Sequence, residues 1–256
     1  MKMQQFCFSK NIDNLELVLD DLWLKGCTAI QENENEVIAF FNEKIDLGIT
    51  GEWQNIDNKD YIAEYYDKLE PIHLKRLVIA PTHRSVKLNS PKRVLWLDPG
   101  MAFGSGHHET TRMALESLEA HDLRSKTVLD LGSGSGILAI AAELLAAERV
   151  LGIDIDPLTI PVAEQNNILN STKANFSLAS IDSIQDNFAD LIVANIYAEI
   201  HEMLIDEYCR VLKADGSLII TGIMLSKLAN LQTVFAKKFK TQSRTTGEWG
   251  LIEAKL

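Results

Sequence analysis

Cysteine is scarce in this chain, and the spacing of the cysteines favours neither a disulfide scaffold nor a zinc site. The 256 residues contain only Cys7, Cys27 and Cys209, which are far apart and odd in number, and no Cys-x-x-Cys pair occurs. A disulfide scaffold and a cysteine-based zinc site are therefore excluded as organising principles. Reduced structural thiols, as in a cytosolic protein, are the expected state.

Long hydrophobic runs are also missing. No uninterrupted apolar stretch approaches the roughly 18 residues of a membrane span, and even "ILAIAAELLAAERVLGI" carries Glu143, Glu148 and Arg149. The N-terminal "MKMQQFCFSKNID" lacks the apolar core of a secretory signal. We expect a cytoplasmic protein with no membrane association.

Positive charge is in short supply. The 25 Lys and Arg residues face 36 Asp and Glu residues, which gives a net charge of -11. A nucleic-acid backbone needs a basic footprint, so we expect no direct nucleic-acid binding. A basic protein or a small molecule is the easier partner, although the acidity could equally serve solubility alone. We expect a monomer.

The front of the chain is typical of a small α+β domain. The segments "QQFCFS" and "EVIAFFNE" have the composition of strands, and "NLELVLDDLWLKG" between them has helical spacing and ends at Gly26. A further strand is expected at "RLVIA". The prolines of "PTHRSVKLNSPKR" indicate a connection. We therefore expect an N-terminal domain at 1–84 that recognises the substrate, a linker at 85–97 and a second domain at 98–256.

In the second domain, short apolar runs alternate with helical stretches. The four pairs are "TVLDL" with "ILAIAAELLAA", "RVLGIDI" with "LTIPVAEQNNILN", "ADLIVANI" with "AEIHEMLIDEYCRVL", and "GSLIITGI" with "LSKLANLQTVFAKKF". This alternation predicts an α/β fold with a doubly wound, mostly parallel sheet and helices on both faces. The last segment, "KTQSRTTGEWGLIEAKL", predicts an antiparallel hairpin that turns at Gly247.

Two glycine clusters could hold a ligand, and the second has the stronger context. "DLGSGSG" links a strand directly to a helix, so Gly132 and Gly134 allow a tight turn and a close approach. Asp154 ends the next strand, where a carboxylate can accept ribose hydroxyls. Asp156 better suits the local start of a helix before Pro157.

Two ligand classes fit this loop: a dinucleotide and S-adenosylmethionine. The dinucleotide spacing counted from Gly132 meets Ile137 where it needs glycine, whereas counted from Gly134 it ends on the tolerated Ala139. A pyrophosphate also sits poorly beside Asp130. S-adenosylmethionine carries an ammonium and a sulfonium instead of phosphates. The charge argument therefore favours S-adenosylmethionine.

At this point the sequence resembles a known family. The motifs "VLDLGSGSGILAIAA", "VLGIDIDPLTI" and "ADLIVANIYAEI" are similar to those of the class I, seven-stranded S-adenosylmethionine methyltransferases. The segment "LDPGMAFGSGHHETTRMALESLE" resembles the signature of the PrmA family, which methylates bacterial ribosomal protein L11. That signature is D-P-G-x-A-F-G-T-G-x-H-x-T-T, and this chain departs from it only by Ser105 in place of threonine. The resemblance is weaker before residue 94, where the usual tryptophans are absent.

The resemblance implies roles for individual residues. Thr111, Gly132, Asp154 and Asn195 fall on positions that contact the cofactor in the family. The first glycine cluster is expected to form a second wall over the cofactor, with Phe103 and Gly104 against it. Gly134 belongs to the cofactor loop.

Asn195 is the catalytic candidate, because it follows "LIVA" at the carboxyl end of a strand, where open α/β sheets bind ligands. Related amino-group methyltransferases have an Asn that opens an N-P-P-Y-like motif there, and this chain has "NIYA". The Asn195 carbonyl can accept a hydrogen bond from an amine and direct its lone pair. The alternative is an Asn that caps the following helix. Tyr197 either lines the amine pocket or packs in the core.

The histidines give no metal prediction. His107, His108 and Glu109 are adjacent, so their side chains diverge, and no H-x-x-x-H pattern or Cys partner is nearby. We expect no metal. His201 lies on an expected helix, where a surface or packing role is anticipated.

Together these features predict an S-adenosylmethionine-dependent protein-lysine N-methyltransferase. The expected substrate is a basic ribosomal protein of the L11 type, modified on lysine side chains or on its N-terminal α-amine. The alternative enzyme acts on another protein or a small amine. A non-catalytic cofactor-binding module and a dehydrogenase are the other classes that remain open.

Overall fold

The structure is a computed structural model. It describes residues 3–12, 15, 18, 19, 22, 25–27, 29–33, 35–56, 70–81, 92–98, 106 and 108–256. The chain forms two compact units, Met1–Lys68 and Leu69–Leu256.

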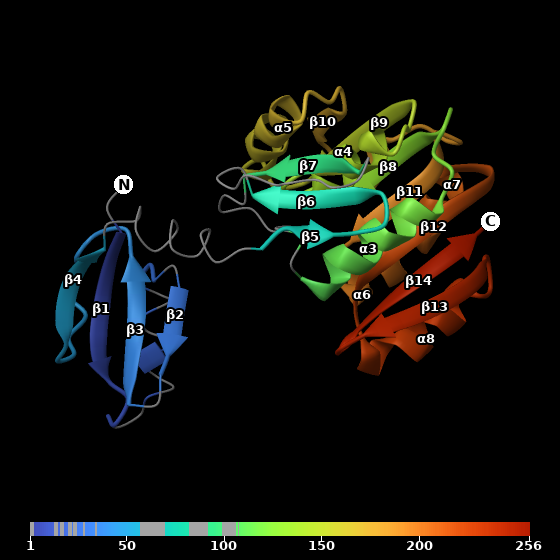
Figure 1. The fold of residues 1–256 in the computed structure, drawn as a ribbon. Coiled ribbons are helices and arrows are strands. Elements are labelled where there is room, and N and C mark those ends of the chain that lie inside the picture. The colour runs from blue at the N-terminus through green and yellow to red at the C-terminus, as the bar shows by residue number, and fades with distance from the viewer. Residues whose placement is uncertain are drawn as a thin grey trace. The chain divides into compact units, whose positions relative to one another are not determined.

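The first unit is built on a four-stranded antiparallel sheet of order β2-β3-β1-β4 (Figure 1). The two strands expected from the sequence are confirmed as β1 (Met3–Ser9) and β3 (Glu36–Phe41). The outer strands, β2 (Ala29–Glu32) and β4 (Glu52–Ile56), were not predicted.

One face of this sheet forms the core of the first unit. Buried and half-buried residues alternate along β3, as expected of a strand with one covered face. Phe6 and Phe41 both pack on Trp53, with ring centroids 5.1 and 5.4 Å apart. In the expected helical stretch, the described residues 15, 18, 19 and 22 are helical, and Leu22 is buried in this core. The rest of that stretch lies outside the described residues.

The second unit contains a seven-stranded sheet of order β10-β9-β8-β11-β12-β14-β13 (Figure 1). Its first five strands are parallel. They are β10 (Asn175–Leu178), β9 (Arg149–Asp154), β8 (Thr127–Leu131), β11 (Ala189–Asn195) and β12 (Leu212–Met224). The predicted hairpin is confirmed as β13 (Lys240–Thr246) and β14 (Trp249–Lys255), antiparallel to each other. The edge strand β10 was not predicted.

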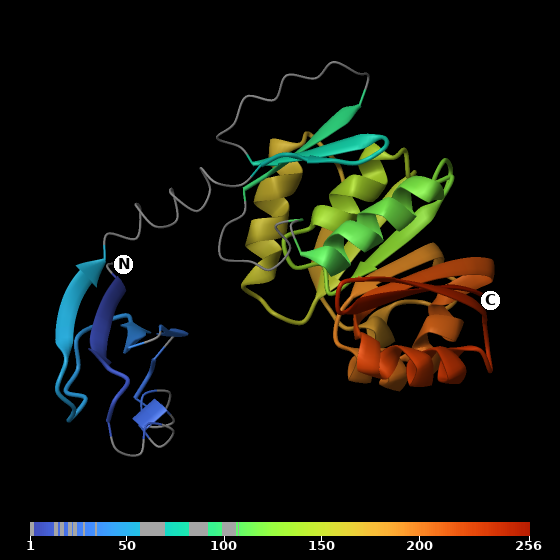
Figure 2. The ribbon, with the colours of Figure 1, turned by 60° about the horizontal axis from the view of Figure 1, so that its bottom comes forward.

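Helices cover both faces of the sheet, as the alternating sequence pattern predicted (Figure 2). The face carrying Val128 and Val193 packs on α3 (Glu109–Ala120) and α4 (Ile137–Leu144). The other face packs on α7 (Ile205–Val211) and α8 (Leu225–Phe235). The remaining helices are α5 (Thr159–Leu169), α6 (Ala198–Met203) and the 3-10 helix η1 (Ile181–Ser183).

A second, three-stranded sheet belongs to the same unit. It consists of β5 (Ile72–His73), β6 (Leu77–Pro81) and β7 (Arg93–Leu97), with β6 and β7 parallel. The structure therefore divides the chain earlier than the expected 1–84 boundary, and the end of the expected linker at 85–97 is a strand. The prolines suggested a connection, but Leu95 and Leu97 after them are buried core residues.

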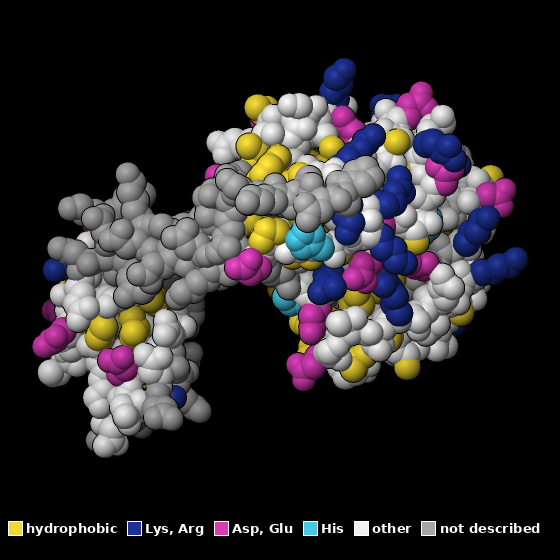
Figure 3. Space-filling model, viewed as in Figure 1, with side chains coloured by type: hydrophobic (Ala, Val, Ile, Leu, Met, Phe, Trp, Pro, Cys, Tyr) yellow, Lys and Arg dark blue, Asp and Glu magenta, His cyan; other side chains and the backbone are white. Residues whose placement is uncertain are grey.

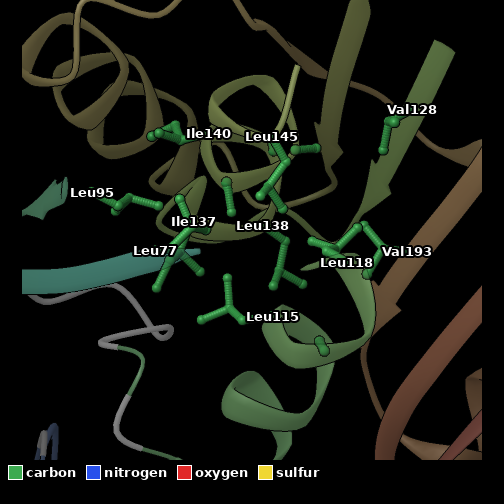
Figure 4. Packing of buried hydrophobic residues seen from close by; sticks show 14 of the residues in the cluster. Leu77, Leu95, Leu115, Leu118, Val128, Ile137, Leu138, Ile140, Leu145 and Val193 are labelled. Atoms are coloured by element: carbon green, nitrogen blue, oxygen red, sulfur yellow. The ribbon is translucent and has the colours of Figure 1, made fainter. Parts of the chain in front are cut away.

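The packing of α4 explains this division. Its first six residues are all buried, which requires apolar cover on both sides of the helix. The seven-stranded sheet covers one side. Leu77 of β6 and Leu95 of β7 lie in the same cluster as Ile137 and Ile140 on the other side (Figure 4). The three-stranded sheet is thus an outer layer of the second unit.

The turn between β5 and β6 is held to α3 by one buried carboxylate. Glu119 accepts hydrogen bonds from the backbone N–H groups of Lys75, Arg76 and Leu77 at 2.9, 2.7 and 2.7 Å.

The surface charges of the second unit are mixed, because Asp and Glu lie among the Lys and Arg side chains on the face shown in Figure 3. Glu116, for example, pairs with Arg244 at 3.0 Å. Within the described residues, no helix is long and apolar enough to cross a membrane.

Replacing Glu119 by alanine should destabilise the second unit strongly. The change leaves three backbone donors without their carboxylate acceptor, so we expect the free energy of unfolding to fall by about 2–4 kcal/mol. Glu116→Ala on the same helix is the matched control. It breaks two partly exposed ion pairs, with Arg112 and Arg244, and should cost about 1 kcal/mol or less. Chemical denaturation measures both, and equal losses would contradict this role of Glu119.

Candidate active site

The loop between β8 and α4 has the backbone of a ligand cradle. Gly132, Gly134 and Gly136 all have positive φ angles, of 74°, 50° and 79°. The N–H groups of Gly132 and Ser133 donate to the carbonyl of Ile153 at the end of β9, at 2.9 and 3.0 Å. Left-handed conformations in such a tight turn favour glycine, which explains the glycine-rich sequence.

Gly132 also allows a close contact with the segment that follows β11. A Cβ atom at this position would lie 2.6 Å from Cγ2 of Ile196. Any side chain here would therefore move either the loop or Ile196. The cofactor loop and the end of β11 are in direct packing contact.

Asp130 lies beneath this loop and is completely buried. Its Oδ2 accepts a hydrogen bond from the Ala139 N–H at 2.9 Å. This N–H group of the first turn of α4 is therefore not available to bind a ligand. Within the described residues, its Oδ1 has no partner. Burial, and secondarily the charge of Asp154, raise the pKa of Asp130 to about 7. A buried carboxylate with a spare oxygen fits a cationic ligand and disfavours an anionic one.

Asp154 ends β9, as the sequence predicted, and its carboxylate is already anchored. One oxygen accepts from the Gly134 N–H at 2.9 Å and the other from the Asp156 N–H at 3.0 Å. Asp156 in turn accepts from the Leu158 N–H just before α5, which agrees with its expected local role. Asp154 therefore joins the glycine loop to the second strand and presents its remaining acceptor capacity to the cavity.

A cavity of about 890 Å³ opens beside these residues. Gly132, Gly134 and Asp154 form part of its lining, and apolar side chains from the segments after β9, β10 and β11 form most of the rest. Its described lining contains acidic residues but no Lys or Arg. A pyrophosphate would lack counter-charge in this cavity, whereas an adenosyl group attached to a sulfonium fits it.

Asn195 and Thr111 meet at the end of β11. Asn195 Nδ2 donates to Thr111 Oγ1 at 3.2 Å, although the residues are far apart in sequence. Thr111 is buried in the first turn of α3, one of the positions that the sequence comparison indicated. The capping alternative for Asn195 is not observed, because α6 has Tyr197 at its N-cap and no side-chain cap.

The other predicted residues of the site divide into two groups. Phe103 and Gly104 lie outside the described residues. Tyr197 is exposed and lines the cavity, so the alternative of a packed core residue is wrong. His108 is the N-cap of α3, where its Nδ1 accepts from the Thr110 N–H at 3.3 Å. The described part of the chain contains no cluster of three or more His, Cys, Asp or Glu residues that could hold a metal.

Of the surface and packing roles anticipated for His201, the surface role is wrong. His201 is fully buried on α6, six residues after Asn195, and both ring nitrogens have hydrogen-bond partners. Burial lowers the pKa of His201 to about 4, despite opposing contacts with the backbone of Thr221 and Ile196. A single histidine among alternating polar and apolar residues carries no signal of burial.

Cofactor binding should depend on the protonation of Asp130. A cationic ligand favours the charged carboxylate, so we expect affinity for S-adenosylmethionine to fall about three- to tenfold between pH 8 and pH 6. Calorimetric titration measures this change. Protonation of the amino group of the cofactor at low pH has the opposite effect, because it adds positive charge to the ligand. The wild-type profile is therefore compared with that of Asp130→Asn, whose affinity should not fall at low pH. An identical pH profile in that variant would contradict the linkage.

Comparisons with known proteins agree with this geometry. The family model "Ribosomal protein L11 methyltransferase (PrmA)" matches residues 3–256. A ribosomal protein L11 methyltransferase of Deinococcus radiodurans is 37% identical and covers 96% of both chains. Its counterpart from Thermus thermophilus is also 37% identical, over 94% of this chain and 95% of the relative.

A solved structure gives the same result. The ribosomal protein L11 methylase of Lactobacillus delbrueckii subsp. bulgaricus matches with a TM-score of 0.68 and 34% identity, over 73% of this chain and 98% of that chain. The resemblance seen around the glycine clusters thus extends over nearly the whole sequence, and S-adenosylmethionine is confirmed as the cofactor. The chain belongs to the ribosomal protein L11 methyltransferase (PrmA) family of S-adenosylmethionine-dependent methyltransferases.

Proposed function

We propose that this chain transfers methyl groups from S-adenosylmethionine to amino groups of ribosomal protein L11. Lysine side chains are the main acceptors in this proposal, with the N-terminal α-amine as a further one. The observation that carries it is the orientation of Asn195. One of its two Nδ2 N–H groups donates to Thr111, and among the described residues its carbonyl oxygen has no partner, so this oxygen can accept from an incoming amine.

The Asn195 carbonyl suits the chemistry of an amine acceptor. A lysine has an ordinary pKa near 10.4, so its deprotonation at pH 7 costs about 4–5 kcal/mol. An apolar cavity wall and a neutral acceptor reduce that cost, because desolvation disfavours the ammonium form. Asn195 then accepts an N–H of the neutral amine and aims its lone pair. No dedicated general base is part of this mechanism.

Positioning supplies most of the remaining catalysis. When bound, S-adenosylmethionine supplies a methyl group on a sulfonium, which is a good leaving group. The residues of the chain hold the two reactants in line, and such alignment contributes about 7–11 kcal/mol in favourable cases. Gly132 and Asp154 fix one side of the site, and Thr111 and Asn195 fix the other.

Charge and domain organisation support a protein substrate. A chain of net charge -11 attracts a basic ribosomal protein. We assign substrate recognition to the first unit, which is folded around a core of its own. The enzyme acts as a monomer without binding nucleic acid in this proposal, and in the cytoplasm, where ribosomal proteins are made.

Substrate identity is tested by radiolabelled methyl transfer. The protein is incubated with labelled S-adenosylmethionine and the separated ribosomal proteins of a strain that lacks this gene, and the label is located by mass spectrometry. Label on lysines of L11 is the expected result. Label on another protein, with cofactor binding intact, would keep the methyltransferase activity and refute the substrate.

Replacing Asn195 by alanine should reduce kcat about 100-fold. The affinity for S-adenosylmethionine should change less than about threefold, because Gly132 and Asp154 are untouched. Asn230→Ala, at an exposed position of α8, is the control and should keep wild-type activity. Steady-state kinetics on L11 and calorimetry separate the two effects. An Asn195→Ala enzyme with full kcat would falsify the catalytic role.

A further inference from the structure

His201 occupies an unusual position for a histidine. It is entirely buried, yet it does not belong to the lining of the cofactor cavity. Its Nδ1 lies 2.9 Å from the Tyr208 hydroxyl and its Nε2 lies 2.9 Å from the Thr221 carbonyl oxygen. A buried polar side chain with both ends engaged fixes the geometry of its partners.

The two partners determine which ring nitrogen carries the proton. The Thr221 carbonyl can only accept, so Nε2 of His201 must be the protonated nitrogen. Nδ1 is then an acceptor, and the Tyr208 hydroxyl donates to it. The ring stays neutral at physiological pH, since burial holds the pKa of His201 at about 4. The Thr221 carbonyl thus selects the tautomer, and Tyr208, itself fully buried, satisfies the acceptor nitrogen that this tautomer leaves.

The Thr221 carbonyl has a second donor. The backbone N–H of Ile196 also donates to it, at 3.2 Å. Ile196 directly follows Asn195, so one oxygen joins the His201 ring to the peptide that carries the catalytic candidate. The Thr221 hydroxyl in turn donates to the Gly250 carbonyl at 3.0 Å, which ties this point of β12 to β14.

Backbone packing leaves this peptide little room to move. A Cβ at Gly222 would overlap the Ile196 carbonyl oxygen, and one at Gly132 would overlap the Ile196 side chain. Ile196 is therefore held between β12 and the cofactor loop. The hydrogen bonds that His201 and Ile196 donate to the Thr221 carbonyl set the position of Ile196 between these two segments.

We propose that His201 is a positioning residue for methyl transfer, which holds the Thr221 carbonyl and through it aims the Asn195 side chain. The inference rests on the proposed catalytic role of Asn195. The relay runs from the Tyr208 hydroxyl to the His201 ring, then through the Thr221 carbonyl to the Ile196 N–H. His201 touches neither cofactor nor substrate in this arrangement.

Three variants separate positioning from packing. Tyr208→Phe keeps the ring packing and removes only the hydroxyl that donates to Nδ1 of His201. His201→Leu fills the space without hydrogen bonds, whereas His201→Gln keeps an N–H donor for the Thr221 carbonyl. Val211→Ala is the control, because Val211 is a buried residue of the same cluster and helix as Tyr208 but has no polar side-chain atom that could join the hydrogen-bonded relay.

The positioning role predicts a loss in kcat rather than in binding. We expect kcat on L11 to fall about 30- to 100-fold in His201→Leu and about 3- to 10-fold in Tyr208→Phe. His201→Gln should recover at least about threefold over His201→Leu. The Kd for S-adenosylmethionine should change less than about threefold in each variant. Val211→Ala should lose thermal stability and keep its kcat.

A double-variant cycle gives the decisive result. If His201 acts through Asn195, adding His201→Leu to Asn195→Ala should lower kcat less than about twofold further, because the two losses are not independent. Multiplicative losses, or an unchanged kcat in the Tyr208 and His201 variants, would overturn the proposal. If His201→Leu does not fold, Tyr208→Phe in the Asn195→Ala background provides the same test.

Failure of this proposal is distinguishable from failure of the proposed function. Full activity of Asn195→Ala alone refutes the catalytic role of Asn195. It also refutes the positioning role of His201, because that role acts through Asn195. A normal kcat in the His201 and Tyr208 variants, together with an impaired Asn195→Ala, refutes only the positioning role.

Discussion

The contact of Ile196 with two glycines is the constraint on which the active site depends. Gly132 in the cofactor loop and Gly222 in β12 both lack the Cβ that would displace this residue. Strands β8, β11 and β12 are parallel neighbours, so their carboxyl ends reach the same edge of the sheet. The cofactor loop and the catalytic candidate therefore share one packed boundary. A side chain at either glycine would displace Ile196, the residue that follows Asn195.

Buried polar side chains connect the elements around this boundary, and each of them bonds to backbone. Asp130 reaches the first turn of α4, Glu119 holds the β5–β6 turn, and His201 holds β12. Each bond satisfies a backbone group that would otherwise be costly to bury. The pKa values of Asp130 and His201 are shifted in opposite directions. Asp130 has a raised pKa beside a site for a cation, whereas His201 stays neutral within the core.

In the proposed reaction, alignment of the two reactants matters more than acid–base strength. A sulfonium needs no activation as a leaving group, and an amine needs only to arrive neutral and in line. A carboxamide is suited to this because it accepts a hydrogen bond without adding charge. One of the two amide N–H groups of Asn195 donates to the Thr111 hydroxyl, which fixes the orientation of the amide and of its carbonyl. The three-stranded outer sheet contributes indirectly, since it completes the cover of α4 beneath the cofactor loop.

Local sequence determined the parallel sheet, its antiparallel end and the cofactor loop, because hydrophobic period and glycine spacing are short-range signals. Asp154 and Asn195 were predicted from their places at strand ends, and Thr111 from a family motif. The sequence did not indicate that residues 93–97 form a strand of the second unit, because burial of that strand depends on α4. It also left open whether His201 lies at the surface or in the core. Only the tertiary structure brings Tyr208 and Thr221 to its ring, since these partners lie on other elements and no local pattern encodes their meeting.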